Sequence, residues 1–203
     1  MQKVLLFPFI LFVVGCTTDV ISKKPLAVVD KMNDLGYREV FQQEKGSGMK
    51  QGKYQKYASD GVLAEEAFFV SDTLDGARIL YYPGGDTLLI ETYRMGSFHG
   101  VFKAFYESGG LELVGAYVDN AMAGEWRKYY KSGNLMEVVT FADNEENGPF
   151  TEYYENGNLK ASGNYLNGDR EHGLLFLYDE EGVLIRKMDC DQGLCKTIWK
   201  TEE

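Results

Sequence analysis

Basic residues, histidine and cysteine are scarce in this chain of 203 residues, and each scarcity excludes a class of protein. Lysine and arginine number 21 against 31 aspartates and glutamates, so the formal charge is −10. A surface this acidic repels phosphate backbones, and we expect no nucleic-acid partner. Two histidines and three cysteines supply few of the ligands that zinc prefers, and we expect no metal site.

Familiar catalytic motifs are also missing. The chain has no Gly-x-Ser-x-Gly, and its glycine-rich stretch 46–53 has one residue too many for a phosphate-binding loop. No serine or threonine follows the lysine of that stretch. We therefore expect neither enzymatic activity nor a cofactor. A carboxylate pair for glycoside hydrolysis is the catalytic alternative that the sequence leaves open.

Glycine and aromatic residues are abundant instead. The 23 glycines accompany only four prolines, and aromatic residues make up 14% of the chain. This combination is typical of turns in a β protein rather than of a low-complexity segment. A hydrophobic fraction of 44% argues against disorder over most of the chain.

Residues 1–15 have the pattern of a signal peptide. A single lysine, Lys3, precedes an apolar run over residues 4–14, and Gly15 follows. A run of 11 residues is shorter than the stretch of about 20 that crosses a bilayer as a helix. The alternative interpretation is a buried strand or helix at the N-terminus.

Residues 13–16, Val-Val-Gly-Cys, resemble the lipobox of bacterial lipoproteins. The resemblance implies cleavage before Cys16 and lipid on its sulfur and new amino group. Thr17, in place of aspartate, resembles the sorting default for the outer membrane, and no acidic run follows Cys16. We expect a lipid anchor in the outer membrane with the protein facing the periplasm. Residues 16–36 are predicted to form a tether.

From Gly52 onward the chain repeats with a period of 24 residues, with a last interval of 25. Position one of each copy is glycine, position ten is glycine again, and position six is aromatic in every copy. Position-one glycines are Gly52, Gly76, Gly100, Gly124, Gly148 and Gly173, and position-ten glycines are Gly61, Gly85, Gly109, Gly133, Gly157 and Gly182.

Each repeat has the pattern of a β-hairpin. Positions two to seven are rich in aromatic and β-branched residues, a glycine-containing turn follows, and a second apolar segment begins at position twelve. No segment of ten or more residues has the helical period. The sequence predicts an all-β fold: an elongated antiparallel meander of about six tandem hairpins. We expect an N-terminal cap over residues 37–51, the repeats over 52–195 and a tail over 196–203.

The fourth copy shows the motif best, as Gly-x-Trp-x-x-Tyr-Tyr-x-x-Gly-x-Leu over residues 124–135. This motif resembles the bacterial variant of the MORN repeat, some members of which are labelled antitoxins of the YwqK type. The resemblance covers residues 52 to about 190 and implies an elongated sheet that binds or scaffolds other molecules. Copy two departs from it, with Arg78 at position three and Thr87 at position twelve.

Tyrosines at position seven form a possible binding ladder. Positions six and seven are adjacent, so on a strand they point to opposite faces, and we expect one row in the core and the other exposed. An exposed row can stack on sugars or grip a partner, whereas packing alone is the alternative. The row consists of Tyr82, Tyr106, Tyr130 and Tyr154.

Cys190 and Cys195 are separated by four residues that include a glycine, which suits a hairpin loop. Cysteines across the base of such a loop can form a disulfide, and an exported protein meets an oxidising compartment. Two free thiols and a metal site are the alternatives.

Three functions follow from these patterns. The first is a lipid-anchored, non-catalytic module that presents a long β surface to another cell-envelope protein. The second is binding of peptidoglycan or polysaccharide through an aromatic ladder. The third is an antitoxin-like neutraliser, although a lipid anchor places the protein on the wrong side of the membrane for a cytoplasmic antitoxin.

Overall fold

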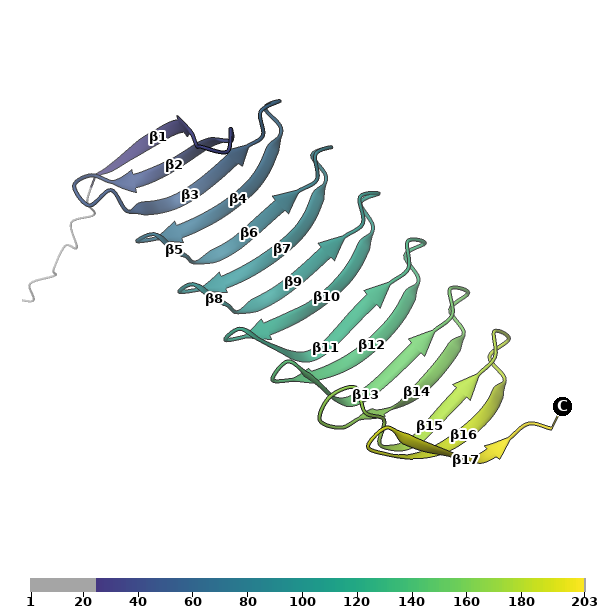
Figure 1. The fold of residues 1–203 in the computed structure, drawn as a ribbon. Helices are drawn as coiled ribbons and strands as arrows, with labels where there is room; N and C mark the ends of the chain where they lie inside the picture. Colours follow the sequence, from purple (N-terminus) through teal and green to yellow (C-terminus); the bar gives the residue numbers. More distant parts are fainter. Residues whose placement is uncertain (1–24, 203) are drawn as a thin grey trace, which may run out of the picture.

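The computed structural model describes residues 25–202, so Cys16 and the predicted signal peptide lie outside the described residues. Within that range all regular structure is β, in 17 strands of one sheet (Figure 1). Among the same residues no helix has the length and apolar character needed to cross a membrane.

Six long hairpins correspond to the six sequence copies: β3–β4, β6–β7, β9–β10, β11–β12, β13–β14 and β15–β16. The strands are β1 (Leu26–Met32), β2 (Arg38–Glu44), β3 (Lys50–Tyr57), β4 (Leu63–Val70), β5 (Thr73–Leu74), β6 (Gly76–Tyr81), β7 (Thr87–Arg94), β8 (Ser97–Phe98), β9 (Gly100–Phe105), β10 (Leu111–Val118), β11 (Ala121–Tyr129), β12 (Leu135–Ala142), β13 (Glu145–Tyr153), β14 (Leu159–Tyr165), β15 (Gly173–Tyr178), β16 (Leu184–Asp191) and β17 (Leu194–Lys200).

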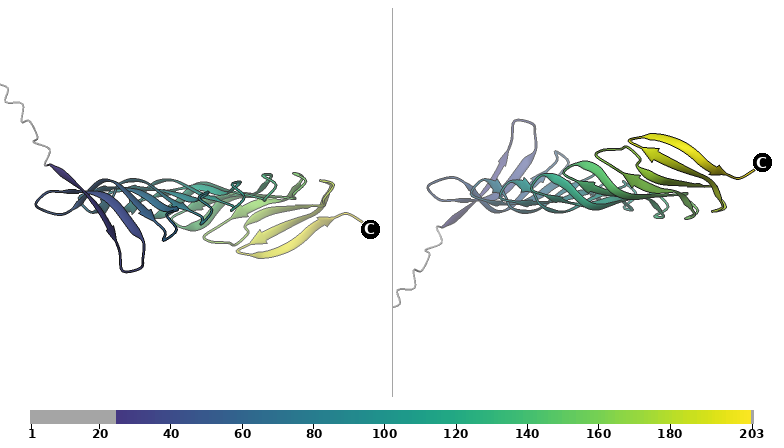
Figure 2. Two further views of the ribbon diagram at one scale, coloured as in Figure 1. Left: turned by 90° about the horizontal axis from the view of Figure 1, so that it is seen from above. Right: turned by 90° about the horizontal axis from the view of Figure 1, so that it is seen from below.

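Long strands pair antiparallel with their neighbours in chain order. The two-residue strands β5 and β8 lie in turns, where β4 also pairs with β6 and β7 with β9. Among the described residues, β1 pairs only with β2 and β17 only with β16, so the sheet does not close. Figures 1 and 2 show a single layer of strands that follow one another along the molecule. The predicted all-β meander of tandem hairpins is confirmed.

The sheet extends beyond the limits predicted for the repeats. Strand β1 lies in the segment predicted as a tether, and β17 continues into the segment predicted as a tail. Each adds one more antiparallel partner to an edge strand that would otherwise expose its backbone polar groups. At the N-terminal end, Asn33 supports the turn because its Oδ1 accepts hydrogen bonds from the backbone N–H groups of Leu35 and Tyr37, each at 3.0 Å.

The hairpin loops lie along one long edge of the sheet, which we call the tip edge, and the turns between hairpins lie along the opposite return edge (Figure 1). At the tip of the fourth hairpin, Tyr130 N–H donates to the carbonyl of Asn134 and Gly133 N–H donates to the carbonyl of Tyr130, both at 2.9 Å. Gly133 adopts φ +90°, a conformation that glycine reaches without strain.

One face of the sheet carries the core, and we call it the core face. Cross-strand pairs such as Tyr54–Ala67 and Trp126–Val139 place positions three and sixteen side by side on it. The core is thin, because each hairpin adds few buried side chains. The buried hydrophobic residues are Phe41, Tyr54, Ala67, Tyr93, Trp126, Val139, Phe150, Ala161, Leu175 and Cys190.

Large rings on the core face lie over residues without side chains. A Cβ added to Gly115 would lie 2.1 Å from Cδ2 of Trp126, and one added to Gly163 would lie 2.9 Å from Cε1 of Phe150. Both distances are too short for real atoms, so the absence of a side chain at position sixteen makes room for the ring beside it. Pairing of large with small residues lets a single layer bury an indole ring.

Backbone hydrogen bonds join each hairpin to its neighbour at the return edge. In six successive turns, one backbone N–H donates to a carbonyl 22 residues earlier, over 2.8 to 3.3 Å. The donor and acceptor residues are Asp72 to Lys50, Gly96 to Leu74, Asn120 to Phe98, Asn144 to Met122, Gly168 to Glu146 and Gly193 to Glu171. We call this series the turn ladder.

The tip loops supply a matched test of backbone conformation in Gly84 and Gly85. A Cβ at either glycine would meet nothing within 4 Å, but Gly85 has φ +93° and Gly84 has no positive φ. Gly85→Ala should lower the free energy of unfolding by about 1–2 kcal/mol, the cost of a left-handed conformation for an L-residue. Gly84→Ala is the control and should be neutral or slightly stabilising. Thermal and urea unfolding measure both, and equal effects would contradict this account of the tip loop.

Candidate functional site

The position-seven tyrosines join hairpins at the tip edge. Each hydroxyl donates to the carbonyl of the position-six residue in the next copy, over 2.6 to 2.9 Å. The pairs are Tyr82 to Phe105, Tyr106 to Tyr129, Tyr130 to Tyr153 and Tyr154 to Tyr178. We call this series the tyrosine ladder. The hydroxyl of every ring in the row therefore has a structural partner, while Tyr82 and Tyr106 also line a cleft of about 530 Å³ at the tip edge.

The expected division into one buried and one exposed tyrosine row is wrong. Tyr129 and Tyr130 are both partly buried, as are the corresponding residues of the neighbouring copies. Alternation of faces applies only within a strand, and strand β11 ends at Tyr129. The register also shifts between Lys128 and Tyr129, and this bulge turns position six out of the regular pleat.

Cys190 and Cys195 form a disulfide, with their sulfur atoms 2.06 Å apart. The two residues face each other across the β16–β17 pair, and Cys190 is buried. The bond therefore fastens the last strand to the end of the repeat array. Within residues 25–202, no three histidine, cysteine, aspartate or glutamate side chains are grouped closely enough to hold a metal ion.

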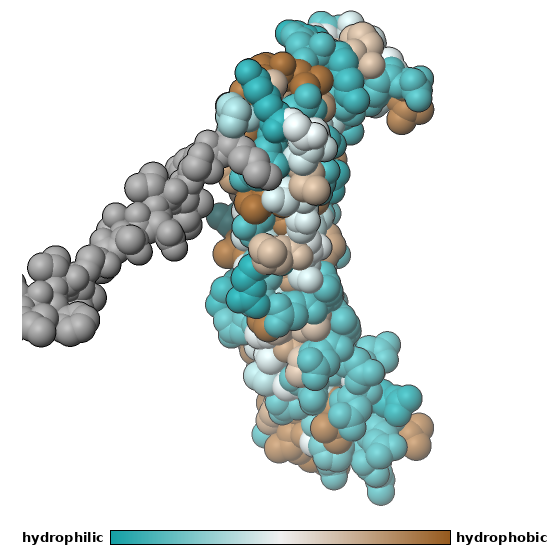
Figure 3. Space-filling view, turned by 90° about the vertical axis from the view of Figure 1, so that its left-hand side faces the viewer, coloured by the Kyte–Doolittle hydropathy of each residue, from teal (hydrophilic) through white to brown (hydrophobic). Residues whose placement is uncertain are grey.

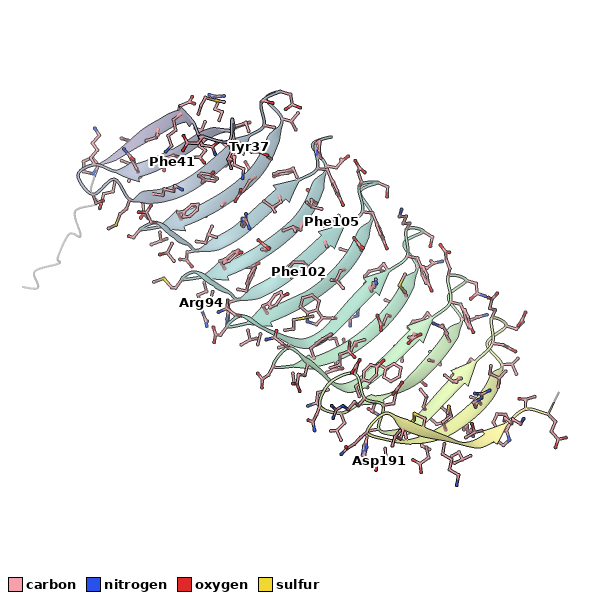
Figure 4. The ribbon with its side chains drawn as sticks, viewed as in Figure 1. Tyr37, Phe41, Arg94, Phe102, Phe105 and Asp191 are labelled. Atoms are coloured by element: carbon pink, nitrogen blue, oxygen red, sulfur yellow. A yellow bond between two sulfur atoms is a disulfide. The ribbon has the colours of Figure 1, made fainter. Side chains whose placement is uncertain are left out.

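Aromatic rings form a continuous row over the middle of the core face. Centroids of successive rings are 4.6 to 6.1 Å apart from strand β7 to strand β12. In Figure 4, Phe102 lies over the middle of the sheet, whereas Phe105 lies towards the tip edge and Arg94 at the return edge. The ring sequence is Tyr93, Phe98, Tyr117, Phe102, Trp126 and Phe141.

A cleft of about 390 Å³ opens on the core face beside this row, and we call it the central cleft. Its apolar lining comes from Ala104, Leu113, Met122, Trp126, Val139 and Phe141. Its charged lining comes from Glu112, Lys128, Glu137 and Glu146, three carboxylates against one ammonium. A second cleft of about 290 Å³ lies over the next hairpins, where Lys160 Nζ is 2.7 Å from Glu152 Oε2.

Two carboxyls of the central cleft are held in unfavourable surroundings. Burial raises the pKa of Glu137, and repulsion by Glu152 raises it further, although Lys128 and Lys160 act in the opposite direction. Burial also raises the pKa of Glu146, with repulsion from Glu137 and Asp169. Both carboxyls therefore favour a nearby positive charge.

A buried ion network occupies the core face where copy two departs from the motif. Arg78 Nε lies 2.7 Å from Glu65 Oε1, and Arg78 Nη1 lies 3.1 Å from Glu91 Oε2. Lys56 Nζ is 2.9 Å from the other oxygen of Glu65, and the Tyr93 hydroxyl donates to Glu91 over 3.1 Å. Burial alone would raise the pKa of Glu65, but Arg78 and Lys56 outweigh it and lower the pKa. Every charge in this network is paired.

Sequence reasoning found Arg78 as a departure from the motif but missed its partners and missed Glu137. A signal was present, because position fourteen holds glutamate in copies one and four, Glu65 and Glu137, and apolar residues in copies two, three and five. Register assigns position fourteen to the core face, since Lys56 pairs with Glu65 and Lys128 with Glu137. A charge on a buried face requires either an internal partner or an external one.

Comparison with known proteins identifies the repeat. Three segments match the family model of the MORN repeat variant: residues 50–71, 122–143 and 146–167. They contain most of copies one, four and five, so the resemblance to this repeat is confirmed at these copies. No curated protein matches the chain. A porin-like protein from Bacteroides uniformis is similar in structure over 85% of this chain and 92% of its own, at 8% identity and a TM-score of 0.22, too weak a likeness to bear on function.

The two adjacent tyrosines of copy four test the tyrosine ladder. Tyr130→Phe removes a hydroxyl that bonds the Tyr153 carbonyl and should lower the free energy of unfolding by about 1 kcal/mol. Tyr129→Phe is the matched control, because no hydrogen bond from its hydroxyl is present in the described structure, and should change stability by less than about 0.5 kcal/mol. Equal effects of the two substitutions on urea unfolding would contradict a structural role for the position-seven tyrosines.

The buried network predicts a different outcome for single and combined substitutions. Arg78→Leu leaves Glu65 and Glu91 buried without a guanidinium and should cost about 3–5 kcal/mol in unfolding free energy. The combination E65A/R78L/E91M introduces the apolar set that copies five and six hold at the equivalent positions, Ala161, Leu175 and Met188. This triple variant should recover most of the lost stability. A triple variant as unstable as Arg78→Leu would contradict the assignment of the loss to unpaired carboxylates.

Proposed function

We propose that the chain is a non-catalytic binding module, anchored by lipid on Cys16 to the bacterial outer membrane, whose core face receives another protein of the cell envelope. The match to the MORN repeat variant supports a repeat module rather than an enzyme. The lipobox resemblance at residues 13–16 supports the proposed lipid anchor. Neutralisation of a cytoplasmic toxin has no support beyond a family label.

The uncovered core face is the observation that carries this proposal. Sheets normally bury their apolar face under a second layer, but no element of residues 25–202 lies over the core face. Two clefts with mixed apolar and charged linings open there instead. On another side of the molecule, hydrophilic and hydrophobic residues are interspersed without one extended apolar patch (Figure 3). A partner on the core face would supply the missing layer.

Glycan binding is the weaker alternative. It requires an exposed row of rings, whereas the position-seven tyrosines are all half-buried and their hydroxyls are engaged in the tyrosine ladder. The ring of Trp126 is only 4% exposed, which leaves little surface for stacking on a sugar. Sedimentation with peptidoglycan nevertheless belongs in the test as a separate arm.

Two neighbouring residues of β11 allow a matched crosslinking test in the native bacterium. Lys128 lines the central cleft, and Arg127 is exposed on the opposite face of the same strand. A photoreactive benzoylphenylalanine at position 128 should crosslink a defined envelope protein, and the same group at position 127 should not. Crosslinks of equal yield from both positions would contradict the choice of face, and cosedimentation with peptidoglycan in place of any crosslink would favour the glycan alternative.

The same cells test the proposed lipid anchor and localisation. Cys16→Ser removes the predicted lipidation site, so the variant should accumulate as precursor or leave the membrane fraction, with loss of the crosslink from position 128. A variant that fractionates and migrates like the wild type would show that the lipid anchor is wrong.

A further inference from the structure

One ion pair within the chain shows how a glutamate on the core face binds a cationic side chain. Glu65 stands at position fourteen of copy one and forms an ion pair with Arg78, at position three of the next hairpin. Lys56 forms an ion pair with the other oxygen of Glu65. A carboxylate that lies only 10% exposed is thereby fully paired. This arrangement shows which charges the fold requires when it buries a glutamate at position fourteen.

Copy four places the same residue type on the core face, half-buried and without such a partner. Glu137 also stands at position fourteen, but position three of the next hairpin is Phe150, which has no charge to offer. Within residues 25–202, the carboxylates of Glu137 and Glu146 accept no hydrogen bond and form no ion pair. Lys128 stands opposite Glu137 in the register yet forms no ion pair with it. The guanidinium that copy two supplies to Glu65 of copy one therefore has no counterpart in copy five for Glu137.

The cleft beside Glu137 has the shape and chemistry for a long cationic side chain. Aliphatic methylenes can lie against the half-buried apolar lining of Leu113, Met122 and Phe141, and three carboxylates belong to the same lining. A second group without a partner lies in the same wall; it is a donor, so it requires an acceptor such as a backbone carbonyl of a bound segment rather than a guanidinium. Trp126 is 4% exposed, and its Nε1 is the buried side-chain donor without a hydrogen-bond partner among the described residues.

We propose that the central cleft binds an arginine side chain from an extended segment of the partner protein, with its guanidinium between Glu137 and Glu146. This inference rests on the proposed function, whose partner it describes by chemistry. Arginine is favoured over lysine because a planar guanidinium can bond two carboxylates at once, as Arg78 bonds Glu65 and Glu91. The net charge of −10 adds long-range attraction for a basic segment.

Short peptides test the cleft on the detergent-solubilised full-length protein. The background variant Trp199→Phe leaves Trp126 as the reporter of the two tryptophans. The probe is acetyl-Ala-Val-Arg-Val-Ala-amide, and its control contains citrulline, which keeps the shape of arginine without the charge. The arginine peptide should change Trp126 fluorescence and release heat in calorimetry, and the citrulline peptide should bind at least about tenfold more weakly.

Two double variants with the same change of net charge separate a local site from general attraction. E137Q/E146Q removes the two cleft carboxylates and should raise the Kd for the arginine peptide at least about tenfold. E145Q/E155Q removes two exposed carboxylates outside the cleft and should leave the Kd within about twofold. Circular dichroism checks that both fold. Equal weakening by both double variants, no preference for arginine over citrulline, or no binding of either peptide would each overturn the proposal.

Failure of the arginine site can be distinguished from failure of the proposed function. If position 128 crosslinks an envelope protein with the same yield in wild type and E137Q/E146Q, and the arginine peptide does not bind, the arginine site is wrong while the binding module stands. If no envelope protein crosslinks even to the wild type, the proposed function fails, whatever the peptides do.

Discussion

Joining neighbouring hairpins is the constraint on which the rest of this structure depends. An isolated two-stranded hairpin cannot bury its own apolar face, and this sheet has no second layer among the described residues to do so. The joints therefore occur at both ends of every central hairpin. At the tip edge tyrosine hydroxyls reach the next copy, and at the return edge backbone N–H groups reach the previous one. Between these two ladders the strands pair in register, and side chains of adjacent copies meet on the core face.

The thinness of the core follows from this arrangement. The layer buries two of its rings over glycines, Trp126 over Gly115 and Phe150 over Gly163. Charges can enter such a core only in paired sets, and the network around Arg78 satisfies that condition within the chain. The carboxylates of Glu137 and Glu146 do not, which makes the central cleft the place where the fold is electrostatically incomplete. A basic partner on the uncovered face would complete both the packing and the charge.

Much of the fold was predictable because its determinants are local. A period of 24 residues with glycine at positions one and ten dictates hairpins and turns, and the positive φ of Gly133 agrees with its place in a tip loop. The two ends of the sheet were harder to predict from the sequence. Strands β1 and β17 lie outside the repeat pattern, since an edge strand needs only a neighbour with free backbone groups and no motif of its own.

The sequence by itself determined the hairpin, its repetition, the open meander and the resemblance to the MORN repeat variant. Only the tertiary structure decided what individual side chains do, because the Arg78–Glu65 ion pair and the tyrosine ladder join residues 13 to 24 positions apart and depend on register. A bulge turns Tyr129 out of the regular pleat, and Tyr130, beyond the end of the strand, donates to the next hairpin, so the row considered as a possible binding ladder is a joint. The same register gave Glu65 a guanidinium and left Glu137 without one. Periodicity specifies the backbone, whereas the pairing of charges across hairpins depends on which single residue each copy places at the shared position.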